Sequence, residues 1–196
     1  MNRFIFALVF TLVGCGSAIA DDASPVVNVK LNPDAWPIEP FSLTDHLGQS
    51  FSEARLHGQW TFVVFGNTQC AERCGAAMTA LAEVRDRMGN AQAGDNTQVL
   101  FISVDPERDT PERLRHYVTR FNKTFIGASG PRTTLAQLST TMNSSDQSTH
   151  SKQSEDASIM LVSPDGFPKA QFFPPYDAAA LTSEYLRIRL CRGQSR

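Results

Sequence analysis

This 196-residue chain contains two cysteines separated by three residues, and side chains of this type at this spacing could react together or bind a metal ion. Cys70 and Cys74 stand four positions apart, and on a helix that step places two side chains on one face, roughly 5–6 Å apart. The first turn of a helix carries unpaired amide groups with partial positive charge, which favour thiolate over thiol. Two such thiolates can close reversibly to a disulfide, or they can hold a soft metal such as Cu(I).

Two plainer kinds of site compete with this interpretation. A permanent structural disulfide is one, although a bridge over so short a loop removes little chain entropy and stabilises inefficiently. A zinc site is the other, and it would need two further ligands at matching spacing, a pattern that we do not find in the sequence. The spacing therefore favours redox or soft-metal chemistry, and a permanent structural disulfide stays an alternative.

Patterns of apolar residues predict the elements that position this pair. The run 60–65 is typical of a strand buried on both faces, and the apolar positions of 73–88 recur at helical spacing. Beyond them the sequence predicts a strand at 99–104, a helix at 111–121 capped by Thr110, a short edge strand at 125–127, a helix at 133–142, a hairpin of 159–162 with 170–173, and a helix from the cap Asp177 to about Leu190. Residues 41–43 and 50–52 predict an earlier hairpin, and the polar stretch 139–158 an exposed, mobile loop.

This succession of strands and helices, closed by a hairpin and a helix, is the thioredoxin order, an α/β fold. The crossovers imply parallel pairing of the buried strands. We therefore expect a central mixed sheet flanked by helices, with the last hairpin antiparallel and an N-terminal β-hairpin extension. Active groups in open sheets lie beyond the carboxyl ends of strands, and Cys70 follows Phe65 by five residues.

The N-terminus predicts export. An apolar run, Phe4–Val13, follows Arg3; it is too short to span a membrane and suits the core of a signal peptide. Ala18-Ile19-Ala20 predicts cleavage after residue 20, whereas Leu12–Cys15 resembles a bacterial lipobox in which Cys15 would be lipidated; an uncleaved anchor is the third alternative. We divide the chain into a signal peptide (1–20), a tether (21–40), the thioredoxin-like domain (41–191) and a tail (192–196). The expected location is periplasmic or extracytoplasmic, an oxidising compartment, with membrane anchoring through the N-terminus as a lipoprotein if Cys15 is lipidated.

The formal net charge of −2 excludes a polybasic arm, so we expect no nucleic-acid partner. A peroxiredoxin would need a proline seven residues before its cysteine and a threonine or serine three residues before it. Val63 and Asn67 stand at those positions, which argues against that enzyme class.

Four motifs, in order along the chain, resemble the Sco/SenC family of thioredoxin-fold, copper-handling assembly proteins. The resemblance covers about Phe41 to Leu190. The motifs are Phe65–Cys70 followed by Cys74, Ile102–Pro111, Phe125–Gly130 and Leu161–Gly166. The resemblance implies that Cys70 and Cys74 act as copper-binding and redox cysteines in maturation of the copper centre of cytochrome c oxidase. It also implies a partner, either the copper-binding subunit of that oxidase or another thiol protein.

The family's copper-binding histidine does not carry over. Glu155 occupies its position, and a carboxylate is a hard ligand that suits Cu(I) poorly. His150, five residues earlier, is the nearest candidate third ligand, although an ordinary solvated histidine is the interpretation that we favour. Two prolines of the family are also replaced, by Ala71 and Gly75. The alternative function is therefore a metal-independent thiol–disulfide oxidoreductase, and a third is a scaffold with a permanent Cys70–Cys74 bridge.

Several other residues have weaker claims to a function. Asp105 either orients the cysteine site or tunes a thiol, or its carboxylate accepts hydrogen bonds from the amides of its own turn. We expect Glu107 and Arg108 to take part in the hydrogen bonding of that turn and not in catalysis. For Cys191 we favour a half-buried structural thiol over a redox role. The remaining histidines, His46, His57 and His116, are expected to be surface or core residues.

Overall fold

The computed structural model describes residues 27–70, 72–89, 96–143 and 157–191. The strands are β1 (Asn28–Leu31), β2 (Ser42–Asp45), β3 (Ser50–Ser52), β4 (Trp60–Gly66), β5 (Thr97–Ser103), β6 (Ile126–Ser129), β7 (Ile159–Val162) and β8 (Pro168–Phe173). The helices are α1 (Arg73–Met88), α3 (Pro111–Thr119), α4 (Arg132–Asn143) and α5 (Ala178–Cys191), with a short 3₁₀ turn at Glu53–Arg55. In these ranges no helix is both long enough and apolar enough to cross a membrane.

All eight strands form one mixed sheet in the order β1-β8-β7-β4-β5-β6-β2-β3. The pairs β4–β5 and β5–β6 are parallel, and β7–β8 and β2–β3 are antiparallel hairpins. The α/β class, the parallel pairing of the buried strands, the N-terminal hairpin and the thioredoxin-like order are thereby confirmed.

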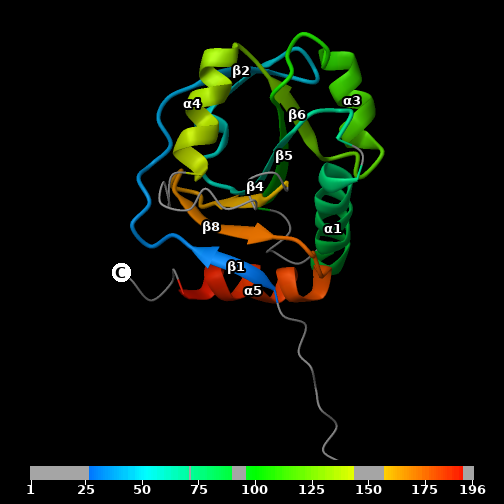
Figure 1. Ribbon diagram of the computed structural model, residues 1–196. Coiled ribbons are helices and arrows are strands. Elements are labelled where there is room, and N and C mark those ends of the chain that lie inside the picture. The colour runs from blue at the N-terminus through cyan, green and yellow to red at the C-terminus, as the bar shows by residue number, and fades with distance from the viewer. Residues whose placement is uncertain (1–26, 71, 90–95, 144–156, 192–196) are drawn as a thin grey trace, which may run out of the picture.

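The sheet separates two apolar cores because its central strands bury side chains on both faces. On one face, Phe62, Val64 and Phe101 pack with α1, α3 and α5. On the other face, Val63 and Leu100 pack with α4 and the N-terminal hairpin. In Figure 1, α4 accordingly lies on the opposite side of the sheet from α1 and α3. Each fully buried large apolar side chain contributes about 1.5–3 kcal/mol, so this two-sided burial holds the central strands rigidly.

Local signals begin two of the helices, α3 and α5, where the sequence predicts. The Thr110 hydroxyl accepts a hydrogen bond from the Arg113 amide at 3.3 Å, with Pro111 in the first turn of α3. The Asp177 carboxylate accepts one from the Ala180 amide at 2.7 Å and caps α5. These bonds satisfy amides that a helix start leaves unpaired.

Three expectations need correction or extension. Strand β6 is an internal strand and not an edge strand, because β2 pairs with its free side. Residues 139–142 belong both to the predicted helix 133–142 and to the predicted loop 139–158, and they are helical, because α4 continues to Asn143. Within the expected tether, Asn28–Leu31 forms β1 and pairs with β8. The predicted signal peptide at 1–20 and the tail at 192–196 lie outside the described residues.

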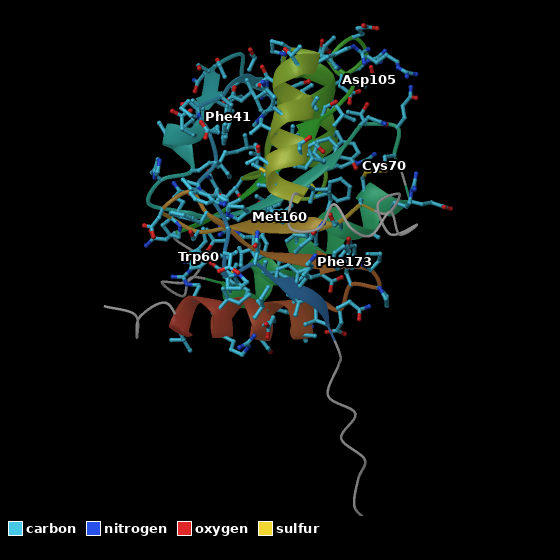
Figure 2. The ribbon with its side chains drawn as sticks, turned by 60° about the vertical axis from the view of Figure 1, so that its left-hand side comes forward. Phe41, Trp60, Cys70, Asp105, Met160 and Phe173 are labelled. Atoms are coloured by element: carbon cyan, nitrogen blue, oxygen red, sulfur yellow. A yellow bond between two sulfur atoms is a disulfide. The ribbon has the colours of Figure 1, made fainter. Side chains whose placement is uncertain are left out.

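The register of four neighbouring strands fixes which ends share an edge of the sheet. Val64 near the end of β4 lies opposite Ile159, which opens β7. Ile159 lies opposite Phe172 near the end of β8, and Phe172 lies opposite Val29 of β1. We call this edge, with the ends of β4 at Gly66 and β5 at Ser103, the carboxyl rim. In Figure 2, Cys70, Asp105 and Phe173 lie on one side of the molecule and Trp60 on the other.

Candidate functional site: a cysteine pair at the carboxyl rim

A tight turn carries the chain from β4 to α1 and places Cys70 at the carboxyl rim. The Cys70 amide donates to the Asn67 carbonyl at 3.0 Å, and the Asn67 side-chain oxygen accepts from the Gln69 amide at 3.0 Å. These bonds are of the kind that asparagine favours in turns. Cys74 falls in the first turn of α1, as predicted.

Cys70 and Cys74 are joined in a disulfide, with their α-carbons 5.4 Å apart. The Cys70 sulfur is half-buried, whereas Cys74 is 1% exposed and belongs to the core beneath α1. The Cys74 amide donates to the Cys70 Sγ at 3.3 Å, so the sulfur nearer to solvent also faces an amide at the start of the helix. A helix start favours negative charge on such a sulfur.

Gly66, the last residue of β4, leaves the space that the buried sulfur fills. A β-carbon at this position would overlap Cys74 Sγ and would come within 3.2 Å of the Phe101 ring. Only glycine therefore lets α1 approach the end of β4 this closely.

A buried carboxylate, Asp109, joins the two strand ends beside the pair. It accepts hydrogen bonds from the Thr68 amide at 2.8 Å, from the Thr68 hydroxyl at 2.6 Å and from the Ser103 hydroxyl at 2.6 Å. Ser103 Oγ also accepts from the Asp105 amide at 3.1 Å. Asp109, Thr68 and Ser103 were not predicted as site residues; the only signal for them is that each stands inside one of the family-like motifs.

The turn Asp105–Asp109 confirms part of what the sequence predicts. Arg108 Nε donates to the Asp105 carboxylate at 2.6 Å, so Arg108 takes part in the bonding of this turn as expected. The Arg108 and Asp109 amides donate to the Asp105 backbone carbonyl, at 3.2 and 2.9 Å, and not to its carboxylate as predicted. Glu107 does not take part in that way; it pairs with Arg132 of α4 at 2.9 Å. A longer contact of 3.5 Å joins Arg108 to Gln69, next to Cys70.

Among the other predicted candidates, the histidines in the described part of the chain make no described contact with the pair. His57 and His116 are exposed, and half-buried His46 accepts a hydrogen bond from the Gly127 amide at 3.1 Å. Cys191 ends α5, and its side chain lies outside the described part. Cys15, Ala71, His150 and Glu155 lie outside the described residues.

The pair offers two cysteine sulfur atoms, and no histidine, third cysteine or carboxylate of the described residues joins them as a ligand. The described residues contain no group of three or more histidine, cysteine, aspartate or glutamate side chains that could hold a metal ion. Once reduced, the pair provides two soft donors, which suit Cu(I) and do not complete a zinc site. The arrangement can also pass two electrons by opening and closing the disulfide.

Comparisons with known proteins agree with this geometry. The family model for SCO1/SenC matches residues 31–188. A Stutzerimonas stutzeri protein named for copper binding is 32% identical over 175 residues, which cover 84% of this chain and 82% of the relative. The human protein SCO1 homolog, mitochondrial, is 35% identical over 99 residues, 50% of this chain and 33% of the human protein. The crystal structure of Arabidopsis thaliana ScoI with copper bound matches with a TM-score of 0.64 at 29% identity, covering 78% of this chain and 98% of that chain. The chain therefore belongs to the SCO1/SenC family.

Proposed function

We propose that this chain handles Cu(I) and exchanges thiols for disulfides in the maturation of the copper centre of cytochrome c oxidase, with Cys70 and Cys74 as its working residues. The observation that carries the proposal is the Cys70–Cys74 disulfide at the carboxyl rim, with one sulfur half-buried and the other in the core. Two relatives are described in terms of copper, and a solved relative is described as a member of the Sco family of cytochrome c oxidase assembly proteins.

The redox step uses Cys70 as the attacking group, because its sulfur is the more accessible of the two. In the dithiol form, the Cys70 thiolate attacks one sulfur of a partner disulfide; a mixed disulfide forms and the other partner sulfur leaves as a thiolate. Cys74 then attacks Cys70 Sγ, the Cys70–Cys74 bond forms, and the second partner sulfur leaves. Two electrons and two protons pass to the partner, and an external dithiol returns them to this chain.

The cargo step uses the same two sulfur atoms. Reduced Cys70 and Cys74 would bind Cu(I) as soft donors and release it to a partner site with more ligands. Because the described residues supply no third ligand, we expect weaker copper binding than in relatives that carry the family histidine.

A metal-independent thiol–disulfide oxidoreductase is the second candidate. It is supported by the same lack of a third ligand among the described residues and by Glu155 at the position of the family histidine. This candidate predicts that the reduced protein opens a partner disulfide without copper and that Cys70→Ser abolishes the reaction.

Titration of the anaerobically reduced protein with Cu(I), against a competing chelator, tests the proposal. We expect one Cu(I) per chain, lost in Cys70→Ser/Cys74→Ser and retained in the matched control Cys191→Ser. His150→Ala is expected to bind copper as the parent does; tight binding that this variant loses would instead make His150 the third ligand. Absence of copper binding, with partner reduction intact, would favour the second candidate. A reduction potential below about −300 mV would identify the bridge as structural and would contradict both candidate functions.

We propose export as well, on the strength of the predicted signal peptide at residues 1–20. The mass of the mature N-terminus tests it. Cleavage after Ala20 gives Asp21 as the first residue, whereas lipidation gives a modified Cys15 as the first residue. A protein isolated with Met1 still in place would contradict both cleavage after Ala20 and lipidation of Cys15.

A further inference from the structure

We propose that Asp109 is a positioning residue for the redox pair: its buried carboxylate holds the turn before Cys70, so that the two thiols stay close enough to re-form their bond. The inference rests on the proposed cycling of the pair between dithiol and disulfide. It concerns a residue that touches neither sulfur in the contacts described above and acts through Thr68.

The hydrogen bonds described for the Asp109 carboxylate come from the two segments that border the pair, the end of β5 and the turn after β4. Its side chain is 3% exposed. Two of its three hydrogen bonds come from Thr68, through the amide at 2.8 Å and the hydroxyl at 2.6 Å, and the third comes from the Ser103 hydroxyl at 2.6 Å. Thr68 lies two residues before Cys70, while Ser103 ends β5, the strand that pairs with β4. One carboxylate therefore fixes the Cys70 turn to the rigid centre of the sheet.

An ionised carboxylate suits this task better than a neutral side chain does. Its two oxygens accept all three donors, whereas an asparagine side chain offers a single oxygen and an NH₂ group that would face donors. Hydrogen bonds to an ionised acceptor are also shorter and roughly twice as strong as neutral ones. Among the described residues no cation pairs with Asp109: the guanidinium of Arg108 bonds Asp105, and that of Arg113 bonds a backbone carbonyl. The three donors thus offset the cost of burying the charge.

The role of Asp109 becomes visible when the disulfide opens. Cys74 stays in place because it belongs to the core beneath α1, and the position of Cys70 then depends on its own turn. The Thr68–Asp109 bonds and the bond from the Cys70 amide to Asn67 hold that turn. Ring closure is an intramolecular reaction, so its equilibrium constant follows the effective concentration of one thiol at the other. Loosening the turn lowers that concentration and makes the disulfide easier to reduce.

The experiment equilibrates the full chain with mixtures of reduced and oxidised glutathione, then alkylates it and measures the disulfide fraction by mass. For Asp109→Asn we expect about a tenfold smaller equilibrium constant for disulfide formation, which corresponds to a potential about 30 mV higher. Thr68→Val removes only the hydroxyl bond and leaves the carboxylate charge, so a shift of about threefold in the same direction is expected. Glu107→Gln removes an exposed carboxylate of the same turn and is the matched control, with no shift.

The outcomes separate positioning from general stability and from charge. A purely structural role would lower the free energy of unfolding of Asp109→Asn, by urea titration, without changing its equilibrium with glutathione. That result would overturn the inference, and so would the absence of a shift in Thr68→Val, because the proposed positioning acts through Thr68. If Asp109→Asn does not fold, the half-buried Thr68→Val decides the question by itself. A disulfide that glutathione cannot open in the parent chain would instead contradict the proposed function.

Discussion

Reduction of the Cys70–Cys74 bridge is expected to cost little stability, and the amount follows from the size of the loop. The two cysteines are four positions apart. In the chain-entropy model, a bridge over a loop of this length restricts the unfolded chain by about 2 kcal/mol at 25 °C. A loop of about 100 residues would give about 4.7 kcal/mol by the same relation. The bridge is therefore a weak constraint on folding.

The folded state retains its other contacts when the bridge opens. Cys74 is 1% exposed and lies against the core, and α1 also buries Met78, Leu81 and Val84. We therefore expect the dithiol form to stay folded and the free energy of unfolding to fall by about 2 kcal/mol, roughly thirtyfold in the unfolding equilibrium constant.

Urea unfolding of the oxidised chain and of the anaerobically reduced chain measures this difference. Trp60, 5% exposed, reports on the core, and the urea dependence should stay nearly the same because both forms expose similar surface. The variant Cys70→Ser/Cys74→Ala removes the bridge without burying a hydroxyl and should match the reduced chain. A loss above about 4 kcal/mol, or a reduced chain that is unfolded without urea, would refute the reasoning and make the disulfide a structural staple.

Two further predictions follow from the geometry. Gly66→Ala should lower the free energy of unfolding by about 1–3 kcal/mol in urea titrations, because its β-carbon would overlap Cys74 Sγ. Gly75→Ala, in helix α1, would meet no atom within 4 Å and should instead raise the free energy of unfolding by up to about 1 kcal/mol; equal effects of the two substitutions would contradict the packing argument. Burial alone would raise the pKa of Asp45, but hydrogen bonds from Arg55 and from the Gln49 and Leu47 amides, with the charge of Arg55, hold that pKa below its ordinary value of 3.8. Asp45→Asn should therefore lower the free energy of unfolding by about 1–2 kcal/mol at neutral pH. This difference from the parent should shrink as the pH falls below 3.8 through the lowered pKa, because the parent then loses the same stabilisation. A difference that stays constant in acid unfolding titrations would contradict this prediction.

The local pattern of apolar residues and helix caps predicted those helices and strands that can be recognised without knowing what they pack against. The apolar run of β4 and the helical spacing of α1 needed no knowledge of distant residues, and the caps Thr110 and Asp177 act within three residues of themselves. Strand β1 was not predicted, because its pairing depends on β8, more than a hundred residues away in the chain. The edge assignment of β6 was wrong for the same reason, since only the folded sheet brings β2 to its side.

The sequence predicted that the two cysteines lie together, but it did not predict the residues that hold them in place. The cysteine pair was found from residue type and a four-residue spacing, both of which are local features of the sequence. Asp109 carries no such signal, because its partner Thr68 stands 41 positions away and its local sequence favours a turn. A hydrogen bond between two loops becomes visible only when the strands that carry those loops are aligned.

The register described above also determines how the protein faces its surroundings. Asn28 opens β1 opposite Phe173, the last residue of β8, so the polypeptide joins the sheet along the same edge from which the sulfur pair emerges. Three strand spacings separate β1 from β4, a distance of about 14 Å. If the residues before Asn28 fasten the protein to a lipid bilayer and the pair exchanges disulfides as proposed, the Cys70 and Cys74 sulfurs would face that bilayer, and a partner would have to present its own sulfur atoms close to the lipid surface.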